Sequence, residues 1–218
     1  MDQPATLLAA VQDRIAKAAS LARRDDPVTL IAISKTHPAE AIAPLIAAGQ
    51  RHFGENRVQE AAAKWPALKD ADPGIVLHHV GQLQSNKAAE AVALYDAIHS
   101  LDRPSLVAAL ARAMDAADKR VACFVQVNIG AEAQKGGCAI AELPALLTEV
   151  RAAGIPLAGL MCVPPADTEA APYFALLGKL ADDNGVSGLS MGMSDDFETA
   201  VMLGATHVRV GSALFGAR

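Results

Sequence analysis

The chain has 218 residues, of which 24 are acidic and 19 are basic, giving a formal net charge of -5. This mildly acidic balance, with basic residues scattered among acidic ones, lacks the basic surface that nucleic-acid binding requires. No apolar run is long enough to cross a bilayer. The start of the chain, Met1-Asp2-Gln3-Pro4, has no basic region followed by an apolar one, so we expect no signal peptide.

The amino-acid composition also indicates the cellular compartment and the kind of hydrophobic core. The three cysteines, Cys123, Cys138 and Cys162, match neither a zinc pattern nor a disulfide framework, and we expect the reducing cytoplasm. Hydrophobic residues make up 52% of the chain and aromatic residues only 4%, so aliphatic side chains must build the core. Such a composition suits helices packed on a parallel sheet. We expect one domain over residues 1–218, because no repeat or linker interrupts it.

The first elements in chain order are a helix, a strand and a second helix. Residues 6–24 have apolar side chains at helical spacing, and Pro27 ends that pattern because proline restricts the residue before it. The apolar, β-branched run at 28–34 indicates a buried strand. Pro38 then opens a helix that Gly49 closes.

This strand–helix alternation continues to the end of the chain. Further strands are expected at 52–54, 75–80, 97–99, 121–127, 157–161, 188–191 and 207–210. Helices are expected from 58 onward and at 85–94, 104–116, 141–152, 168–182 and 195–203, with a final turn from Ser212. About eight alternations are typical of a closed (β/α)8 TIM barrel in the α/β class. A doubly wound open sheet is the alternative fold that the pattern leaves open.

Lys35 is the most informative polar residue, because it follows the first apolar strand, and a barrel places its site at the carboxyl ends of its strands. A lysine in that position either reaches solvent or is partly buried. Partial burial makes the amine a nucleophile toward carbonyl groups. The alternative is an ordinary solvated loop lysine.

Two loops after the last two strands are typical of a phosphate site. Ser190-Met191-Gly192-Met193-Ser194 leads into a helix, and Gly211-Ser212 opens the final turn. Glycine lets the backbone approach a ligand, and helix starts offer free N–H donors. Ordinary helix capping by Ser194 and Ser212 is the alternative interpretation.

Arg209 ends the last expected strand and would put a fixed positive charge beside a ligand in the same pocket. The alternative is a salt bridge with a carboxylate at the barrel mouth, such as Glu55 or Asp102.

These segments together resemble the pyridoxal 5′-phosphate (PLP) homeostasis protein family, also called the YggS/PROSC family. The resemblance covers nearly the whole chain, and the segments 189–198 and 208–218 are the most specific. The other matching segments are Ala32-Ile33-Ser34-Lys35-Thr36, His52-Phe53-Gly54-Glu55-Asn56, Gly81-Gln82-Leu83-Gln84-Ser85-Asn86-Lys87, Gln126-Val127-Asn128-Ile129 and Gly159-Leu160-Met161.

The resemblance implies a fold-type-III PLP barrel like the N-terminal domain of alanine racemase. It implies that Lys35 carries PLP as a Schiff base, that Arg209 meets the pyridine nitrogen, and that Asn56 lies near the ring. The phosphate would be surrounded by Ser190, Ser194, Gly211 and Ser212. Met161 and Met191 lie in matching segments and complete the expected cofactor-binding set together with His79, which stands where the family often has an aromatic residue. A second departure is Gly136-Gly137, where a serine-glycine pair is usual.

The function implied is that of a PLP carrier that buffers or delivers the cofactor, with PLP-dependent apoenzymes as partners and without strong catalytic activity. The alternative function is an amino-acid racemase of the alanine racemase type. Racemisation needs a proton donor or acceptor on each face of the substrate, and Lys35 could serve only one. Barrel racemases take the other from a tyrosine on a second domain of a partner subunit.

The sequence offers few groups for that second face. Its tyrosines, Tyr95 and Tyr173, lie in expected helices or helix ends, and this chain ends about where the second domain would begin. Cys162 and His79 are the remaining candidates. We therefore expect a carrier rather than a racemase, and a monomer, because the racemase dimer relies on the second domain.

A metal site is not expected. His78 and His79 are adjacent in a strand, so their side chains point to opposite faces and cannot chelate together. Lys87 and Lys135 follow expected strands and could contact phosphate, although surface charge is the favoured interpretation for both.

Overall fold

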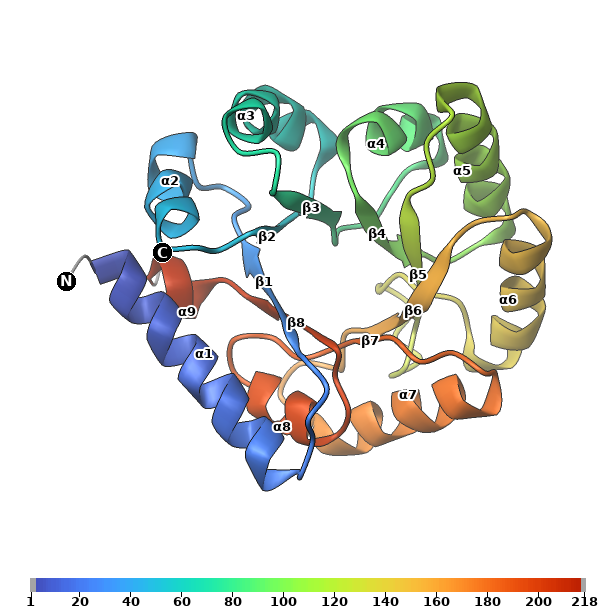
Figure 1. Cartoon of the computed structure of the whole chain (residues 1–218). Coiled ribbons are helices and arrows are strands. Elements are labelled where there is room, and N and C mark those ends of the chain that lie inside the picture. The colour runs from blue at the N-terminus through green and yellow to red at the C-terminus, as the bar shows by residue number, and fades with distance from the viewer. Residues whose placement is uncertain (1–2, 217–218) are drawn as a thin grey trace.

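Parallel strands form a closed barrel in this computed structural model, which describes residues 3–216. The expectations about the two ends of the chain partly concern residues outside this range, namely Met1, Asp2, Ala217 and Arg218. The strands pair in chain order, and the last pairs with the first (Figure 1). They are β1 (Thr29–Ile33), β2 (His52–Glu55), β3 (Val76–His79), β4 (Ala97–Leu101), β5 (Ala122–Val127), β6 (Leu157–Cys162), β7 (Leu189–Ser190) and β8 (His207–Val210). The predicted (β/α)8 barrel is confirmed, and the open sheet is wrong.

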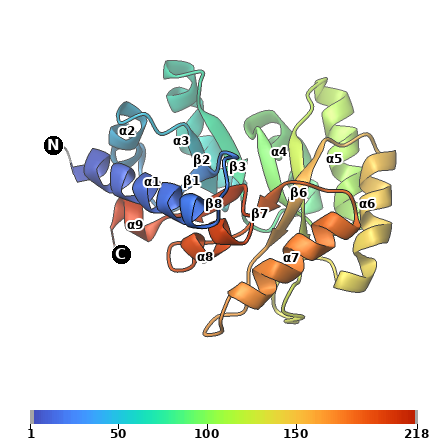
Figure 2. The same ribbon diagram turned by 60° about the horizontal axis from the view of Figure 1, so that its bottom comes forward.

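Helices surround the barrel on its outside, as the end-on and tilted views show (Figures 1 and 2). They are α1 (Gln3–Leu21), α2 (Ala39–Ala47), α3 (Val58–Ala71), α4 (Ala88–Leu94), α5 (Pro104–Ala117), α6 (Leu143–Ala152), α7 (Ala171–Asp183), α8 (Phe197–Met202) and α9 (Ser212–Phe215). The helices α4 and α6 begin later than expected, because the 3-10 turns Ser85–Lys87 and Ile140–Glu142 precede them. Within residues 3–216 no helix is long and apolar enough to cross a membrane.

The N-terminal helix completes the outer layer. A barrel helix normally follows each strand, but α9, after β8, has only 4 residues. The much longer α1 packs against α8, α9 and α2 and covers that gap (Figure 1). Its buried residues, Leu8, Val11, Ile15 and Ala18, follow the helical spacing that predicted it.

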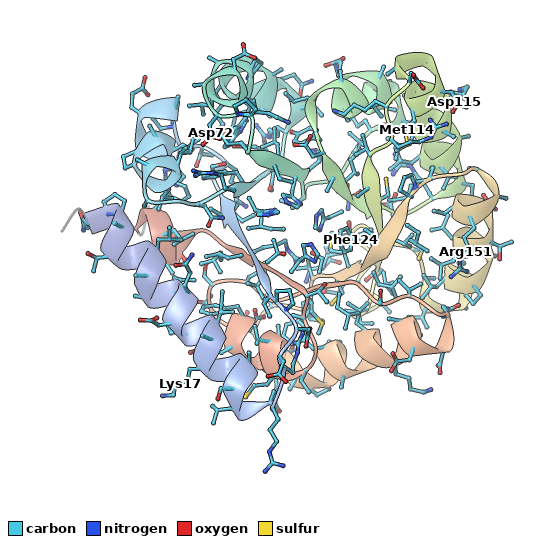
Figure 3. The ribbon with its side chains drawn as sticks, in the orientation of Figure 1. Lys17, Asp72, Met114, Asp115, Phe124 and Arg151 are labelled. Carbon is cyan, nitrogen blue, oxygen red and sulfur yellow. The ribbon has the colours of Figure 1, made fainter. Side chains whose placement is uncertain are left out.

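The apolar core lies between the strands and the helices, whereas the inside of the barrel is partly polar. Phe53 points outward and its ring lies 5.0 Å from the Trp65 ring of α3. Its neighbour His52 contacts His78 instead, which lies in the next strand. Phe124 lies within the ring of strands (Figure 3) and stacks on His99 at 4.2 Å. Side chains therefore fill the barrel, and the carboxyl ends of the strands are left to form a site.

The cysteines are structural in this arrangement. Cys123, Cys138 and Cys162 are free and buried, in agreement with the expected absence of a disulfide framework. Burial raises the pKa of each thiol to about 12. The thiols are therefore protonated at neutral pH and poor nucleophiles.

Candidate functional site

One pocket of about 510 Å³ lies at the carboxyl ends of the strands, within the size range usual for small-molecule sites. It is lined by Ile33, Lys35, His37, Asn56, Val80, Val163, Met193, Ser194, Arg209, Gly211, Ser212 and Gly216. Six of the ten residues predicted from the sequence are among them, and they lie at the carboxyl ends of four strands, β1, β2, β7 and β8. The described lining holds two basic side chains, Lys35 and Arg209, and no carboxylate.

Lys35 stands in a tight turn directly after β1. The next residue, Thr36, has a left-handed backbone with φ of 67°, and such a conformation persists only where neighbouring contacts hold it. Lys35 is half-buried. Its Nζ makes no hydrogen bond or ion pair within residues 3–216. The amine is thus held at the pocket and left available to a ligand.

A half-buried lysine on α3, Lys64, holds that turn in place. Lys64 Nζ donates to the carbonyl oxygens of Ser34 and His37, each at 2.9 Å, on either side of Lys35. The same Nζ pairs with Glu55 Oε1 at 2.8 Å. Glu55 is fully buried and its Oε1 also accepts hydrogen bonds from Ser34 Oγ at 2.7 Å and Trp65 Nε1 at 3.0 Å. The turn that carries Lys35 is therefore fixed to the helix layer by a buried ion pair.

Arg209 is a buried cation at the floor of the pocket. It is 5% exposed, and its Nη1 donates to Ser190 Oγ at 2.7 Å while its Nη2 donates to the Cys162 carbonyl at 2.9 Å. Burial lowers its pKa from the usual value, yet a guanidinium keeps its proton at neutral pH. No carboxylate within residues 3–216 forms a salt bridge with it, and Asp196 attracts it only from beyond salt-bridge distance.

The salt bridge considered for Arg209 from the sequence is therefore wrong. Glu55 pairs with Lys64, and Asp102 pairs with Arg103 at 2.6 Å. Glu55 ends β2 and Asp102 follows β4, and each is bound to a cation other than Arg209.

The loops after β7 and β8 are joined to each other. Ser194 Oγ accepts a hydrogen bond from the Gly211 N–H at 3.2 Å. Capping by Ser194 and Ser212 is wrong, because Asp196 precedes α8 and Gly211 precedes α9 at the capping positions. Gly192 has φ of 91°, and a Cβ there would lie 2.5 Å from the Ala200 Cβ, so only glycine fits this loop.

Asn56 reaches the pocket through a close backbone approach. A Cβ on Gly81 would lie 2.3 Å from the Asn56 carbonyl oxygen. The absence of a side chain at Gly81 therefore lets the loops after β2 and β3 pack together beside the pocket.

Four predicted cofactor contacts do not line the pocket. Ser190 and Met161 are paired in the β6–β7 ladder and buried, and Met191 is fully buried just after β7. His79 points to the helix layer, where its ring lies 4.9 Å from the Tyr95 ring. Burial lowers the pKa of His79 to about 4. Contact of these four residues with a cofactor stays a prediction.

Sequence reasoning missed several residues of the site. His37 lines the pocket and stacks on Phe215 at 4.4 Å, and its position two residues after Lys35 was the available signal. Lys64 gave no signal, because it lies mid-helix with alanine before it and tryptophan after it.

Comparison with known proteins identifies the family. Residues 7–218 match the family model described as alanine racemase, N-terminal domain. A Pseudomonas aeruginosa protein named pyridoxal phosphate homeostasis protein is 42% identical over 218 residues, covering 97% of this chain and 94% of its own. PipY of Synechococcus elongatus, solved with PLP bound, has a TM-score of 0.84 at 38% identity, covering 98% of this chain and 100% of its own.

The likeness to working racemases is more distant. A Clostridium difficile alanine racemase has a TM-score of 0.71 at 13% identity, covering 95% of this chain and 56% of the racemase. That level of identity shows the barrel fold alone. The full-length match to the curated relative, together with the family model, shows that this chain belongs to the pyridoxal phosphate homeostasis protein family, whose barrel is of the alanine racemase N-terminal type.

Proposed function

We propose that this chain binds PLP through a Schiff base on Lys35 and acts as a carrier of the cofactor rather than as an efficient catalyst. The observation that carries the proposal is the charge pattern of one pocket. An unpaired amine and a buried guanidinium without a salt bridge face the same space, and no carboxylate is among the described lining residues. PLP brings an aldehyde for the amine and a phosphate whose negative charge suits such a pocket. The relative PipY, solved with PLP bound, supports this choice.

The remaining lining residues supply suitable donors. The hydroxyls of Ser194 and Ser212 can donate to phosphate oxygens, while the Gly211 N–H holds the Ser194 oxygen in place. Arg209 has only donors, so a pyridine nitrogen placed against it must accept and cannot carry a proton. When bound, PLP supplies an electron-withdrawing ring, and an unprotonated ring nitrogen weakens that property. This pairing favours storage of the cofactor over catalysis.

The racemase alternative lacks a suitable second acid or base among the groups predicted from the sequence. Cys162 and His79 are buried and do not line the pocket. Burial also raises the pKa of Tyr95, whose hydroxyl donates to the Arg57 carbonyl. We therefore expect no rapid exchange of the α-proton of L- or D-alanine with D2O. Exchange at rates typical of enzymes, on the order of 1 per second or faster, would restore the racemase function.

The test of PLP binding is an absorbance titration followed by borohydride reduction and peptide mapping. The reduced adduct should map to Lys35, and Lys35→Ala should abolish it. Lys135→Ala and Lys87→Ala are the matched controls, because both lysines follow other strands and are already paired, with Glu132 and Glu90. An adduct on Lys135 or Lys87, or a wild-type protein that refuses PLP, would refute the proposal.

Delivery to apoenzymes, the single domain, the monomer and the cytoplasmic location are further parts of the proposal. The open position of the pocket at the strand ends supports an exchange route. Transfer of bound PLP to an apoenzyme should be faster than its dissociation into buffer. Light scattering should give the mass of one chain, and unfolding should be a single transition over the whole chain. The free, buried cysteines fit a reducing compartment.

A further inference from the structure

A chain of hydrogen-bonding side chains runs through the inside of the barrel and ends at Arg209. His52 Nδ1 and His78 Nε2 lie 3.0 Å apart, and His78 Nδ1 and His99 Nε2 lie 2.9 Å apart. His99 Nδ1 lies 2.8 Å from Ser190 Oγ, which accepts the hydrogen bond from Arg209. His52 lines a second cavity of about 740 Å³ near the starts of β1 and β2. This hydrogen-bonded series of side chains therefore connects the two ends of the barrel.

The hydrogen bonds from His52 to Ser190 can all point in only two self-consistent directions if each ring carries one proton. In the first, Ser190 Oγ–H donates to His99, and each ring then donates from Nε2 to Nδ1 of the next, so all three rings are Nε2–H tautomers. In the second, every donor and acceptor is reversed, and the rings are Nδ1–H tautomers.

Ser190 decides between the two directions. In the second direction its oxygen accepts from both Arg209 and His99, and its own proton has no acceptor within the described residues. A buried donor without a partner is unfavourable. In the first direction every one of these groups is satisfied. The dipoles also point their negative ends toward the guanidinium, and this arrangement stabilises a buried cation that forms no salt bridge within the described residues.

The surroundings keep the rings neutral. Burial is the largest cause that lowers the pKa of His52, His78 and His99, and His207 lowers those of His78 and His99 further. His207, whose ring lies 6.0 Å from His99, bonds Thr206 instead and is not part of the chain. Phe124 closes the other side of His99 by stacking on it.

We propose that His99 is a positioning residue for Arg209, and that His52, His78 and His99 form a polarised chain of Nε2–H tautomers that makes Ser190 present its lone pairs to the guanidinium. These hydrogen-bonded side chains hold Arg209 without neutralising it, so that the charge of Arg209 stays available to the pocket. The benefit for PLP rests on the function proposed above. Ser190 thereby acts behind Arg209, as a link between it and the histidines.

The direct test needs no ligand. Nitrogen-15 NMR of the histidine rings in the ligand-free protein at pH 7.5 distinguishes the Nε2–H, Nδ1–H and doubly protonated forms. We expect His52, His78 and His99 all to be Nε2–H. An Nδ1–H or doubly protonated form at any of the three would overturn the inferred direction.

A variant series tests the consequence for PLP binding. His99→Phe keeps the stacking on Phe124 but removes the acceptor for Ser190, and should raise the Kd for PLP about tenfold. His99→Asn places an amide oxygen near the former Nδ1, and should restore the Kd to within about threefold of wild type. His207→Phe is the matched control, because it changes a neighbouring ring outside the chain.

The outcomes separate this inference from the function. If His99→Phe and His207→Phe raise the Kd equally, or if His99→Asn does not restore it, His99 is merely structural and the inference fails. If the wild-type protein does not bind PLP at all, the proposed function fails, and the tautomers measured by NMR then decide the inference alone.

Discussion

The buried pair between Lys64 and Glu55 gives the sharpest prediction about stability. Lys64→Met keeps most of the aliphatic side chain but removes the Nζ that bonds Glu55 and the two carbonyls beside Lys35. The Glu55 side chain is not exposed and the Lys64 side chain is 10% exposed. Water therefore cannot replace the lost ammonium group beside the Glu55 carboxylate. The variant leaves a buried carboxylate without its cation.

Breaking a buried ion pair by removing one partner is unfavourable by about 3–5 kcal/mol. A domain of 218 residues loses about 2–4 °C in Tm for each kcal/mol. Lys64→Met should therefore lower the Tm of the ligand-free protein by about 6–20 °C. The turn carrying Lys35 should also loosen, so formation of the borohydride-trapped adduct at Lys35 should slow.

Calorimetry of the ligand-free protein checks this result. Lys179→Met is the matched control, because Lys179 forms an exposed pair with Asp183, and its Tm should change by no more than about 2 °C. Adding Glu55→Gln to Lys64→Met should recover part of the loss, since the orphaned charge is then removed. A Lys64→Met protein that melts within about 2 °C of wild type would refute the reasoning.

Three further predictions concern pH, backbone and thiols. Burial lowers the pKa of His79 and His207 from 6.5 to about 4, so the unfolded chain binds protons first as the pH falls. Urea unfolding should show full stability above pH 6.5 and a loss of up to about 3 kcal/mol per histidine by pH 4; a flat profile would contradict this. Gly192→Ala should lower stability and PLP affinity more than Gly185→Ala, because a Cβ at Gly185 meets no atom within 4 Å; equal losses would speak against a special role for Gly192. A thiol reagent should react with the three cysteines only after unfolding, and rapid labelling of the native protein would show that they are not buried.

The strands of the barrel were predictable from the sequence because both faces of a parallel barrel strand are buried. Their apolar runs therefore stand out, and most strand limits agree within about two residues. The same property hides the direction of each side chain. His78 and His79 are equally buried, yet one faces the barrel interior and the other faces Tyr95. Alternation predicts opposite faces but does not say which residue lies inside.

Contacts between distant elements explain the other differences. The grouping of Lys35 with Arg209 followed from the rule that barrel strands end at one face. The bonds from Lys64 to the turn around Lys35 and the link from His99 to Ser190 join elements far apart in the sequence, and no local pattern marks either. They depend on which strand face and which helix turn meet, which only the closed barrel determines.

The unpaired charge of Arg209 should make the ligand-free protein less stable than it needs to be. A buried cation whose hydrogen bonds go only to neutral groups has lost its hydration without gaining a salt-bridge partner. Arg209→Met fills a similar volume, and leaves one carbonyl, that of Cys162, without its donor while Ser190 keeps His99. The variant should therefore match or exceed the wild type in Tm without ligand, and PLP should no longer raise its Tm.

Once PLP is added, the wild type should have a higher Tm than Arg209→Met. A ligand that binds only the folded state stabilises that state, and does so more strongly the tighter it binds. Arg209→Met is compared with Arg103→Met, which removes a guanidinium already paired with Asp102 and away from the pocket. If Arg209→Met lowers the Tm of the ligand-free protein by more than Arg103→Met does, then Arg209 is a structural residue. The buried guanidinium would then serve the stability of the barrel and not the binding of a ligand.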